Sequence, residues 1–270
     1  RQKAVFSSTG GMGVKSGGLQ IGVDIGSIER VYDNYLDSQI IQQNQLVGYH
    51  ETKADILSNV ETIFDESKGG GFADLLGRFW GNWQDLSGNP DGQVQRSALL
   101  STADCLAGMF RDISAGLKNI KTSTEQEISS VVTEINSIVA AIGDLNERIV
   151  GAGSVQGGAN LMQDKRTELL KSLGNLIDIN TLEGLDGSVK IFLSNGELLV
   201  DGTMTRSLAL EPRGTDSSVS DIVFADRPGE AVTGSIKQGK LGALIEARDE
   251  IILQYVNRID TLATGIADEV

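Results

Sequence analysis

Two apolar heptad seams between residues 99 and 149 constrain the fold of this sequence more than any other feature. Their residues recur at alternating steps of four and three: Leu99, Ala103, Leu106, Phe110, Ile113, Leu117 and Ile120, then Ile128, Val131, Ile135, Ile138, Ile142, Leu145 and Ile149. The step from Thr124 to Ile128 joins them with a four-residue insertion, a stutter that relaxes a left-handed supercoil. No proline interrupts residues 91–150. We therefore expect one or two helices that total about 55 residues and about 80 Å, packed against other helices.

Further helices are expected on both sides of this segment. Helical spacing predicts a helix from about residue 28 to 66, with Ser27 as its N-cap, and a short one from Phe72 to about Leu86. Trp80 and Trp83 in the short helix are interpreted as core residues. A helix capped by Asn160 is expected to turn six side chains inward: Leu161, Met162, Leu169, Leu170, Leu173 and Leu176. The last helix carries a seam from residue 239 onward: Leu241, Ile245, Arg248, Ile252, Tyr255, Ile259, Leu262 and Ile266.

A β pattern separates these helices near the C-terminal end. Val189, Ile191 and Leu193 alternate, Asn195-Gly196 is a strong hairpin signal, and Asp201-Gly202 marks a second turn. Residues 208–210 and 222–224 supply later strands. Residues 1–27 are expected to be extended, with a strand near 19–25. The fold class is therefore α+β: an elongated long-helix bundle with a small antiparallel β domain inserted before the last helix. We expect a helical core of residues 1–183 plus 238–270 and a β insertion of residues 184–237.

Charge and composition exclude several classes of function. With 23 basic and 37 acidic side chains the net charge is −14, which argues against binding to nucleic acid or to an anionic membrane surface. No run of 18 uncharged apolar residues is present, so no membrane span is expected. The one cysteine, Cys105, excludes an intrachain disulfide and is interpreted as buried. The one histidine, His50, is interpreted as a surface or seam residue.

The sequence indicates no catalytic, cofactor-binding or metal-binding residues. Gly10-Gly11-Met12-Gly13 lacks the Gly-Lys-Ser/Thr ending of a phosphate loop. Asp186-Gly187 and Asp201-Gly202 lack the alternating acidic ligands of a calcium loop. Two charged clusters are interpreted as solvated helix faces with ion pairs instead of metal sites: Asp164, Arg166 and Glu168, and Glu246, Arg248, Asp249 and Glu250. We therefore expect no cofactor and no enzymatic activity.

Four segments in this order resemble a known family. They are residues 24–36 (DIGSIERVYDNYL), 79–90 (FWGNWQDLSGNP), 159–166 (ANLMQDKR) and 239–244 (GKLGAL). Together they resemble the core domain of the FlgK family of flagellar hook-associated proteins, which form the first layer of the hook–filament junction. Thr167 departs from the family pattern, which usually places an acidic residue there, and this leaves one local ion pair in doubt.

The resemblance implies a non-catalytic structural subunit of the bacterial flagellum that serves motility. It implies an extracellular location, reached through the flagellar type III channel, in keeping with the absence of a visible signal peptide. The implied partners are the hook protein, the second junction protein and copies of the same chain, with an export chaperone bound through a C-terminal segment. Family members polymerise through terminal apolar helices, which we interpret as lying outside this sequence. The 270-residue chain alone is therefore expected to be monomeric.

Two alternatives stay open at this point. Within the structural class, the chain is compatible with another axial protein, either the second junction protein or a flagellin, although the block around Trp80 and Trp83 favours the first junction protein. From a different class, a helical scaffold is compatible with a metal-dependent enzyme.

Overall fold

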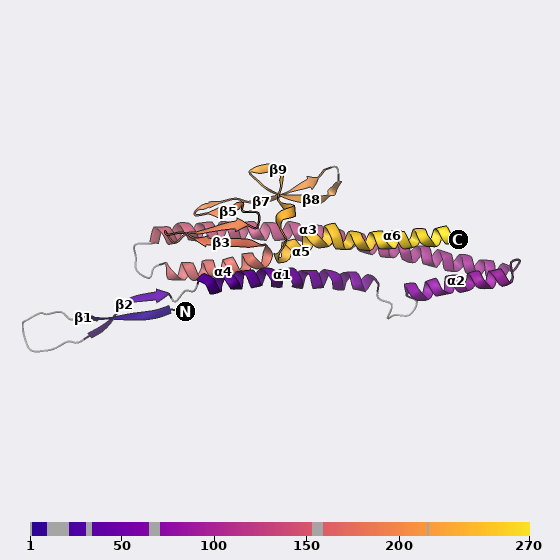
Figure 1. The fold of residues 1–270 in the computed structure, drawn as a ribbon, viewed down its shortest axis with the longest axis horizontal. Coiled ribbons are helices and arrows are strands. Elements are labelled where there is room, and N and C mark those ends of the chain that lie inside the picture. The colour runs from indigo at the N-terminus through magenta and orange to yellow at the C-terminus, as the bar shows by residue number, and fades with distance from the viewer. Residues whose placement is uncertain (1, 10–21, 31–33, 65–70, 153–158, 215) are drawn as a thin grey trace, which may run out of the picture. The chain divides into compact units, whose positions relative to one another are not determined.

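The computed structural model describes residues 2–9, 22–30, 34–64, 71–152, 159–214 and 216–270. The helices are α1 (Asn34–Ile63), α2 (Phe72–Gly88), α3 (Gln93–Ala152), α4 (Asn160–Leu176), α5 (Gly239–Glu246) and α6 (Ile252–Glu269), with a 3-10 turn η1 (Thr233–Ser235) and a π-helical turn η2 (Ala247–Ile251) (Figure 1). The strands are β1 (Gln2–Thr9), β2 (Gly22–Arg30), β3 (Ile179–Glu183), β4 (Val189–Leu193), β5 (Leu198–Asp201), β6 (Met204–Thr205), β7 (Leu208–Arg213), β8 (Asp216–Phe224) and β9 (Arg227–Ala231).

The chain forms two compact units. The first unit comprises residues 1–48, 131–211 and 221–239, and the second comprises residues 49–130, 212–220 and 240–270. Helices α1 and α3 contribute residues to both units. The division inferred from the sequence, with a helical core and a β insertion at residues 184–237, stays a prediction.

Helix α3 is a single helix of 60 residues, about 90 Å long at 1.5 Å per residue. The predicted seam residues are its buried or half-buried side, and Leu117, Ile128, Ile135 and Ile142 have no exposed surface. Thr124, at the stutter, is also buried, and its hydroxyl donates to the Ile120 carbonyl at 2.8 Å. The heptad interpretation of this segment is confirmed.

Helix α3 also contains the one stretch in the described residues that is long and apolar enough to cross a membrane, with a window of mean hydropathy 1.3. Of that window, 44% is buried inside the protein. The core helix of a water-soluble protein meets the same criterion, so length and composition carry no membrane assignment here.

Two predicted helix starts are wrong. Residues 22–30 form strand β2, antiparallel to β1 with Ala4 opposite Ile28, so Ser27 lies in a strand and helix α1 begins only at Asn34. Pairing with β1 satisfies the backbone groups of this segment, which outweighs a helical spacing of only a few residues. Helix α4 begins at Asn160 itself, with Ala159 at the N-cap position.

Leu161, which was expected to point inward in α4, is instead 78% exposed. Leu170, Leu173 and Leu176 of the same helix are buried as predicted. Leu161 lies in the first turn of the helix, where fewer neighbours cover a side chain.

In the first unit, strands β3, β4, β5 and β6 form one sheet in chain order, with antiparallel pairing at each step. The predicted turns lie where expected: Gly196 connects β4 and β5, and Gly202 connects β5 and β6, both with positive φ. Strand β3 starts at Ile179, before the β pattern recognised in the sequence. Strands β7, β8 and β9 form a second sheet.

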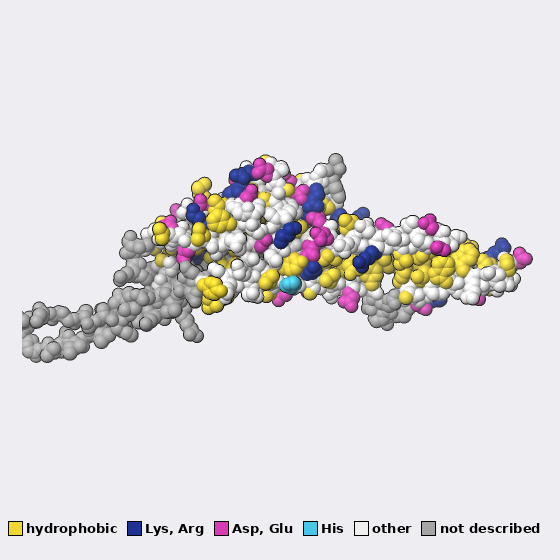
Figure 2. All heavy atoms as spheres, viewed as in Figure 1, with side chains coloured by type: hydrophobic (Ala, Val, Ile, Leu, Met, Phe, Trp, Pro, Cys, Tyr) yellow, Lys and Arg dark blue, Asp and Glu magenta, His cyan; other side chains and the backbone are white. Residues whose placement is uncertain are grey.

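Two apolar clusters lie among the described residues of the second unit. Val60, Ile113, Leu117 and Ile252 form one, and Leu75, Phe79, Leu99 and Leu106 form the other. Trp83 packs against the latter cluster, whereas Trp80 is 41% exposed, so the core interpretation is wrong for Trp80. Figure 2 shows hydrophobic side chains gathered between α2 and α6, where Leu76, Trp80, Leu262 and Ile266 line a shallow hollow.

The seam predicted for the last helix continues through α5, η2 and α6. Leu241, Ile245 and Ile252 are buried, and Tyr255, Ile259 and Ile266 are half-buried, whereas Leu262 is 39% exposed. Arg248, which the periodicity put in this apolar seam, is buried with 2% exposure.

Candidate functional site

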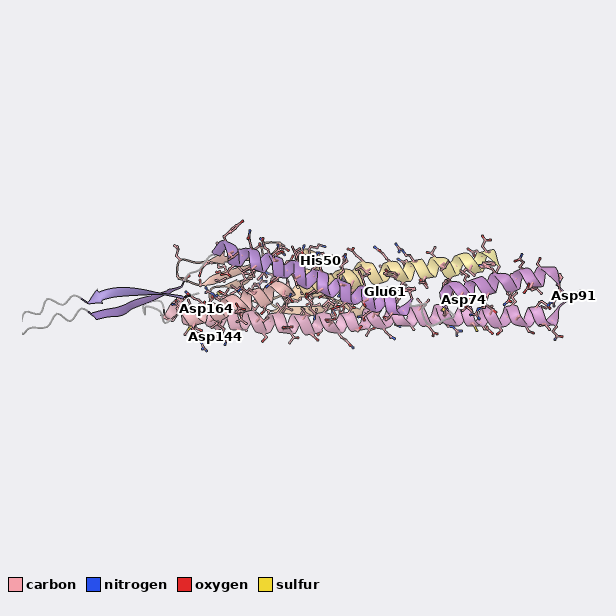
Figure 3. The ribbon with its side chains drawn as sticks, turned by 90° about the horizontal axis from the view of Figure 1, so that it is seen from below. His50, Glu61, Asp74, Asp91, Asp144 and Asp164 are labelled. Atoms are coloured by element: carbon pink, nitrogen blue, oxygen red, sulfur yellow. The ribbon has the colours of Figure 1, made fainter. Side chains whose placement is uncertain are left out.

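The described residues contain no group of three or more His, Cys, Asp or Glu side chains placed to hold a metal ion. His50 is exposed, and Cys105 is exposed instead of buried as expected from the sequence. In the second unit, His50, Glu61, Asp74 and Asp91 lie at separate points and do not converge (Figure 3). Polar groups gather instead around two buried arginines, one in each unit.

In the first unit, Arg166 of α4 is the centre of what we call the Arg166 cluster, with Asn146 and Glu183. The guanidinium Nη1 donates to Asn146 Oδ1 at 2.9 Å and to the Gly187 carbonyl at 2.6 Å, and Nη2 pairs with Glu183 Oε1 at 3.1 Å. Asn146, fully buried in α3, donates to the carbonyls of Val189 (2.9 Å) and Gly202 (2.7 Å). Its Oδ1 also accepts from the Val189 amide at 3.1 Å. These bonds attach two hairpins to the helices α3 and α4.

The hairpin held by this cluster has a projecting tip. The turn between β3 and β4 is closed by two bonds, Gly187 N to the Gly184 carbonyl at 3.1 Å and Gly184 N to the Ser188 carbonyl at 2.7 Å. Gly187 has φ +80°, a conformation that favours glycine and is typical of a three-residue hairpin loop. Leu185 at the tip is 111% exposed, the highest value among the exposed large hydrophobic residues of the described chain.

Asp186, next to Leu185, is held in place by Ser188. Its Oδ1 accepts from the Ser188 amide at 3.0 Å and from the Ser188 hydroxyl at 2.7 Å. These hydrogen bonds lower the pKa of Asp186, and the bond from the hydroxyl has a larger effect than the bond from the amide. The tip therefore presents an apolar side chain beside an ionised carboxylate.

In the second unit, Arg248 of η2 is the centre of the Arg248 cluster, with Glu125, Asp249 and Arg213. Arg248 donates to both carboxylate oxygens of Asp249 at 2.9 Å and to Glu125 Oε2 at 2.9 Å. Arg213, at the end of β7, donates to both Asp249 oxygens at 3.1 Å. Arg248 Nη1 donates to the Ser220 carbonyl at 2.7 Å, and Glu125 Oε1 accepts from the Ser220 amide at 2.8 Å. The cluster thus fixes strands β7 and β8 to helices α3 and η2.

Burial and hydrogen bonding act in opposite directions on the Arg248 cluster. Burial by itself raises the pKa of Asp249, but hydrogen bonds from Arg248 and Arg213 outweigh it and the pKa lies below its usual value. For Arg248, burial lowers the pKa, and the bonds to Asp249 and Glu125 raise it by more. Both groups are therefore charged at neutral pH, as expected for a buried arginine whose three nitrogens each donate to an acceptor.

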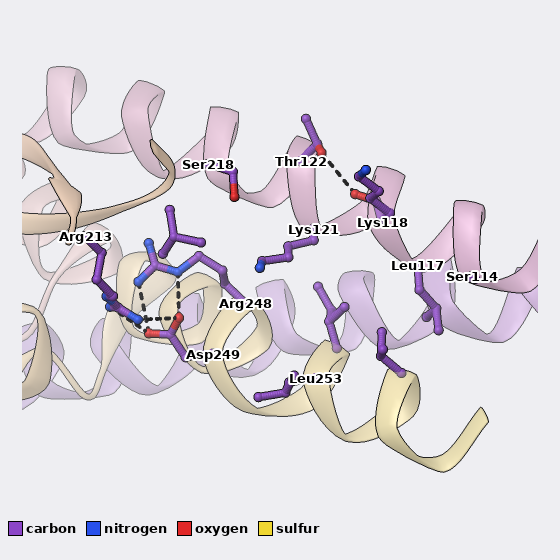
Figure 4. Close-up of a pocket in the computed structure, with 13 residues that line it drawn as sticks. Ser114, Leu117, Lys118, Lys121, Thr122, Arg213, Ser218, Arg248, Asp249 and Leu253 are labelled. Atoms are coloured by element: carbon purple, nitrogen blue, oxygen red, sulfur yellow. Dashed lines mark hydrogen bonds and ion pairs between the residues drawn. The ribbon is translucent and has the colours of Figure 1, made fainter. Parts of the chain in front are cut away.

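A groove of about 560 Å³ lies beside the Arg248 cluster, between α3, α6 and the residues Arg213, Ser218 and Val219 of β7 and β8. Its floor is apolar and is formed by Leu117, Val219, Ile252, Leu253 and Val256. Its charged lining residues are four basic ones, Lys118, Lys121, Arg213 and Arg248, and one acidic one, Asp249. Lys121 extends from α3 into this space (Figure 4). Within the described part of the chain, neither Lys118 nor Lys121 forms an ion pair. We call this feature the basic groove.

A third polar contact joins α1 to α5. Lys53 pairs with Glu246 at 2.9 Å, and the Tyr49 hydroxyl donates to the same carboxylate. The pKa of Tyr49 is raised, mainly by burial and to a smaller extent by the hydrogen bond to Glu246. This arrangement stabilises helix packing and contains no group suited to attack a substrate.

Sequence reasoning missed both arginine clusters. Arg166, Arg248 and Asp249 were assigned to solvated helix faces, and this is wrong because strand residues far away in the chain cover them. Glu246 and Asp249 are partly buried, whereas Glu168 and Glu250 are exposed as predicted. Thr167, at the position of the family's acidic residue, is buried and donates to the Gln163 carbonyl at 2.9 Å. The one sequence signal for a buried arginine was the heptad periodicity of the last helix, which put Arg248 in an apolar seam.

The chain is similar to proteins from several bacteria. The family model described as the helical domain of the flagellar hook-associated protein FlgK matches residues 57–270. The flagellar hook-associated protein 1 of Bacillus subtilis is 29% identical over 84% of this chain and 48% of its own length. That of Salmonella typhimurium is 25% identical over 99% of this chain and 49% of its own length. The chain thus spans about half the length of these relatives.

A solved structure has the same fold. The flagellar hook junction protein FlgK from Burkholderia pseudomallei superposes with a TM-score of 0.67 and 24% identity, covering 80% of this chain and 39% of that one. The expected combination of long helices with a small antiparallel β region before the last helix is confirmed by this likeness.

Proposed function

Because the chain belongs to the FlgK family of flagellar hook-associated proteins, we propose that it is a structural, non-catalytic part of the junction between hook and filament. The observation that carries this proposal is the match of the family model to residues 57–270, a range that contains both arginine clusters and the basic groove. The relatives at 25–29% identity bear names of the same kind.

The internal construction of the chain supports a structural role. In the first unit, Asn146 and Arg166 attach hairpin loops directly to helices, and in the second unit Arg248 and Glu125 do the same for strand β8. Buried hydrogen-bonded networks between helix side chains and strand backbone favour one arrangement of the elements. A subunit that passes mechanical load between two polymers needs this kind of rigidity.

The proposal extends to partners and location. As a member of this family the protein interacts with other flagellar components and is located in the bacterial flagellum. We propose more specifically that it contacts the hook protein, the second junction protein and copies of itself, that an export chaperone accompanies it, and that it reaches the cell exterior by the flagellar type III route. Neither alternative from the sequence is favoured by an observation: the matching family model is that of FlgK, and the described residues contain no metal-binding group.

We also propose that residues 184–237 form a β domain inserted into the helical core. Two bonds support this proposal: Lys237 N, at the end of the segment, donates to Asp178 Oδ2 at 3.2 Å, and Ser194 Oγ after β4 donates to the Ser235 carbonyl at 2.6 Å. Replacing the segment with a short linker should leave the helices folded by circular dichroism. Loss of the helical signal would show that the strands are integral to the core.

Deleting the gene in its source organism tests the junction function. Cells are expected to keep their hooks, to lose attached filaments and to release filament protein into the medium. The full-length gene on a plasmid should restore filaments. Filaments that stay attached to hooks in the deletion strain, seen by electron microscopy, would refute the proposed function.

A further inference from the structure

The chain carries an exposed apolar tip that has no apolar partner of its own. Leu185 is 111% exposed on a turn closed by two backbone hydrogen bonds, and Arg166 donates to the Gly187 carbonyl in the same turn. The tip is therefore preorganised, and binding through it would order few additional torsions. The ionised Asp186 lies next to it.

The basic groove has the complementary properties. Its floor includes Leu117, Ile252 and Leu253, and its edge carries Lys118 and Lys121, which form no ion pair within the described residues. The chain as a whole has a net charge of −14, whereas the lining of this groove contains four basic residues and one acidic residue. Such a groove fits an apolar side chain flanked by a carboxylate.

We propose that Leu185 of one copy of this chain inserts into the basic groove of a second copy, with Asp186 facing Lys121. This inference rests on the proposed function, because it supplies a contact between copies in the junction.

The symmetry of this contact agrees with a layer of subunits. The tip and the groove consist of different residues, so the contact is heterologous and can propagate from copy to copy into a ring or a helix. A single inserted leucine with one ion pair buries little surface and belongs to the class of weak contacts. The isolated chain is therefore still expected to be monomeric at low micromolar concentration.

Disulfide trapping tests the contact in the 270-residue chain. In a C105S background, which removes the exposed native thiol, L185C is mixed with L253C, whose position lines the groove and is 53% exposed. The matched control mixes L185C with L100C, at a position that is 68% exposed in α3 and outside the groove. We expect at least fivefold more mixed disulfide with L253C. Equal yields, or formation of only L185C self-dimers, would overturn the proposal.

Charge reversal supplies a second, independent measurement. K121E in the L253C copy should reduce trapping about fivefold, and D186K in the L185C copy should restore it, because the ion pair is re-formed with opposite signs. R111E, at an exposed position elsewhere on α3, is the control and should change nothing. An equal loss with R111E and K121E, or no rescue by D186K, contradicts the assigned pairing.

The full-length protein separates this inference from the proposed function. If L185D and K121E each restore attached filaments to the deletion strain as well as the unaltered gene does, the tip-and-groove contact is wrong and the junction function stands. If the deletion strain itself keeps its filaments, the junction function is wrong. We expect both variants to be secreted and to fail in attachment.

Discussion

Replacing Asn146 with alanine is expected to destabilise the first unit more than any other single polar substitution in α3. The Asn146 side chain is fully buried and makes four hydrogen bonds: two donated to the carbonyls of Val189 and Gly202, and two accepted from the Val189 amide and from Arg166. Asn146→Ala removes the partner of each of these groups, and the buried backbone of Val189 is too deep for water to replace the amide easily.

The expected magnitude follows from these bonds. A neutral hydrogen bond contributes about 1 kcal/mol and one to a charged group about 1.5–3 kcal/mol, so the loss at Asn146 is roughly 5 kcal/mol. Asn136 provides a matched control in the same helix and unit. It is half-buried and makes two bonds of 2.8 Å to the backbone of Leu208, so Asn136→Ala should cost roughly 2 kcal/mol.

Urea unfolding followed by far-UV circular dichroism measures both variants. At a slope of about 2 kcal/mol per molar urea, the midpoint should fall roughly 1.5 M further for Asn146→Ala than for Asn136→Ala. Trp80 and Trp83, the two tryptophans of the chain, both lie in the second unit, so their fluorescence follows that unit separately. Equal midpoints for the two variants would refute the bond-by-bond argument.

Three further predictions concern other parts of the chain. Asp249→Asn should lower the free energy of unfolding by about 2–3 kcal/mol at pH 7, because it removes the carboxylate shared by two arginines. The folded-state pKa of Asp249 is lowered, so the difference in stability from the unaltered protein should shrink as the pH falls from about 4 through that lower pKa. Urea titrations at several pH values measure this difference. Ile135→Ala, at a position without exposed surface, should cost roughly 2–5 kcal/mol, and Ile138→Ala, at a half-buried position of the same seam, clearly less. Similar melting temperatures would contradict the argument that burial sets the cost within the seam. Gly239→Ala should lower the free energy of unfolding by roughly 1–3 kcal/mol, because φ is +72° and a Cβ would lie 2.6 Å from the backbone nitrogen of Ile177. Gly234→Ala is the control, since a Cβ there meets nothing within 4 Å. Equal unfolding midpoints for the two variants would show that the backbone at residue 239 adjusts freely.

The long helices could be predicted from the sequence because their signal is local and repeated. Fourteen apolar positions at alternating steps of four and three between residues 99 and 149 specify one buried side of a helix, and the turns at Gly196 and Gly202 follow from a requirement for positive φ. The resemblance to the family likewise depended only on residues in order along the chain.

The helix starts could not be predicted in the same way, because each depends on a partner elsewhere. Residues 22–30 pair with residues 2–9, and this pairing replaces the first turns of the expected helix. The burial of Cys105 was also predicted wrongly, because residue type gives only an average tendency and position 105 faces outward from α3.

The sequence by itself determined the fold class, the buried side of α3 and the family, since each follows from residue order and periodicity. Only the tertiary structure decided the positions of the charged residues. Arg166 and Arg248 are buried because the Gly187 turn and the Ser220 strand, 21 and 28 residues away along the chain, supply carbonyl acceptors and exclude water from them. A local pattern of charges is the same for a solvated helix face and for a buried network, and only the groups that long-range folding brings into contact distinguish the two.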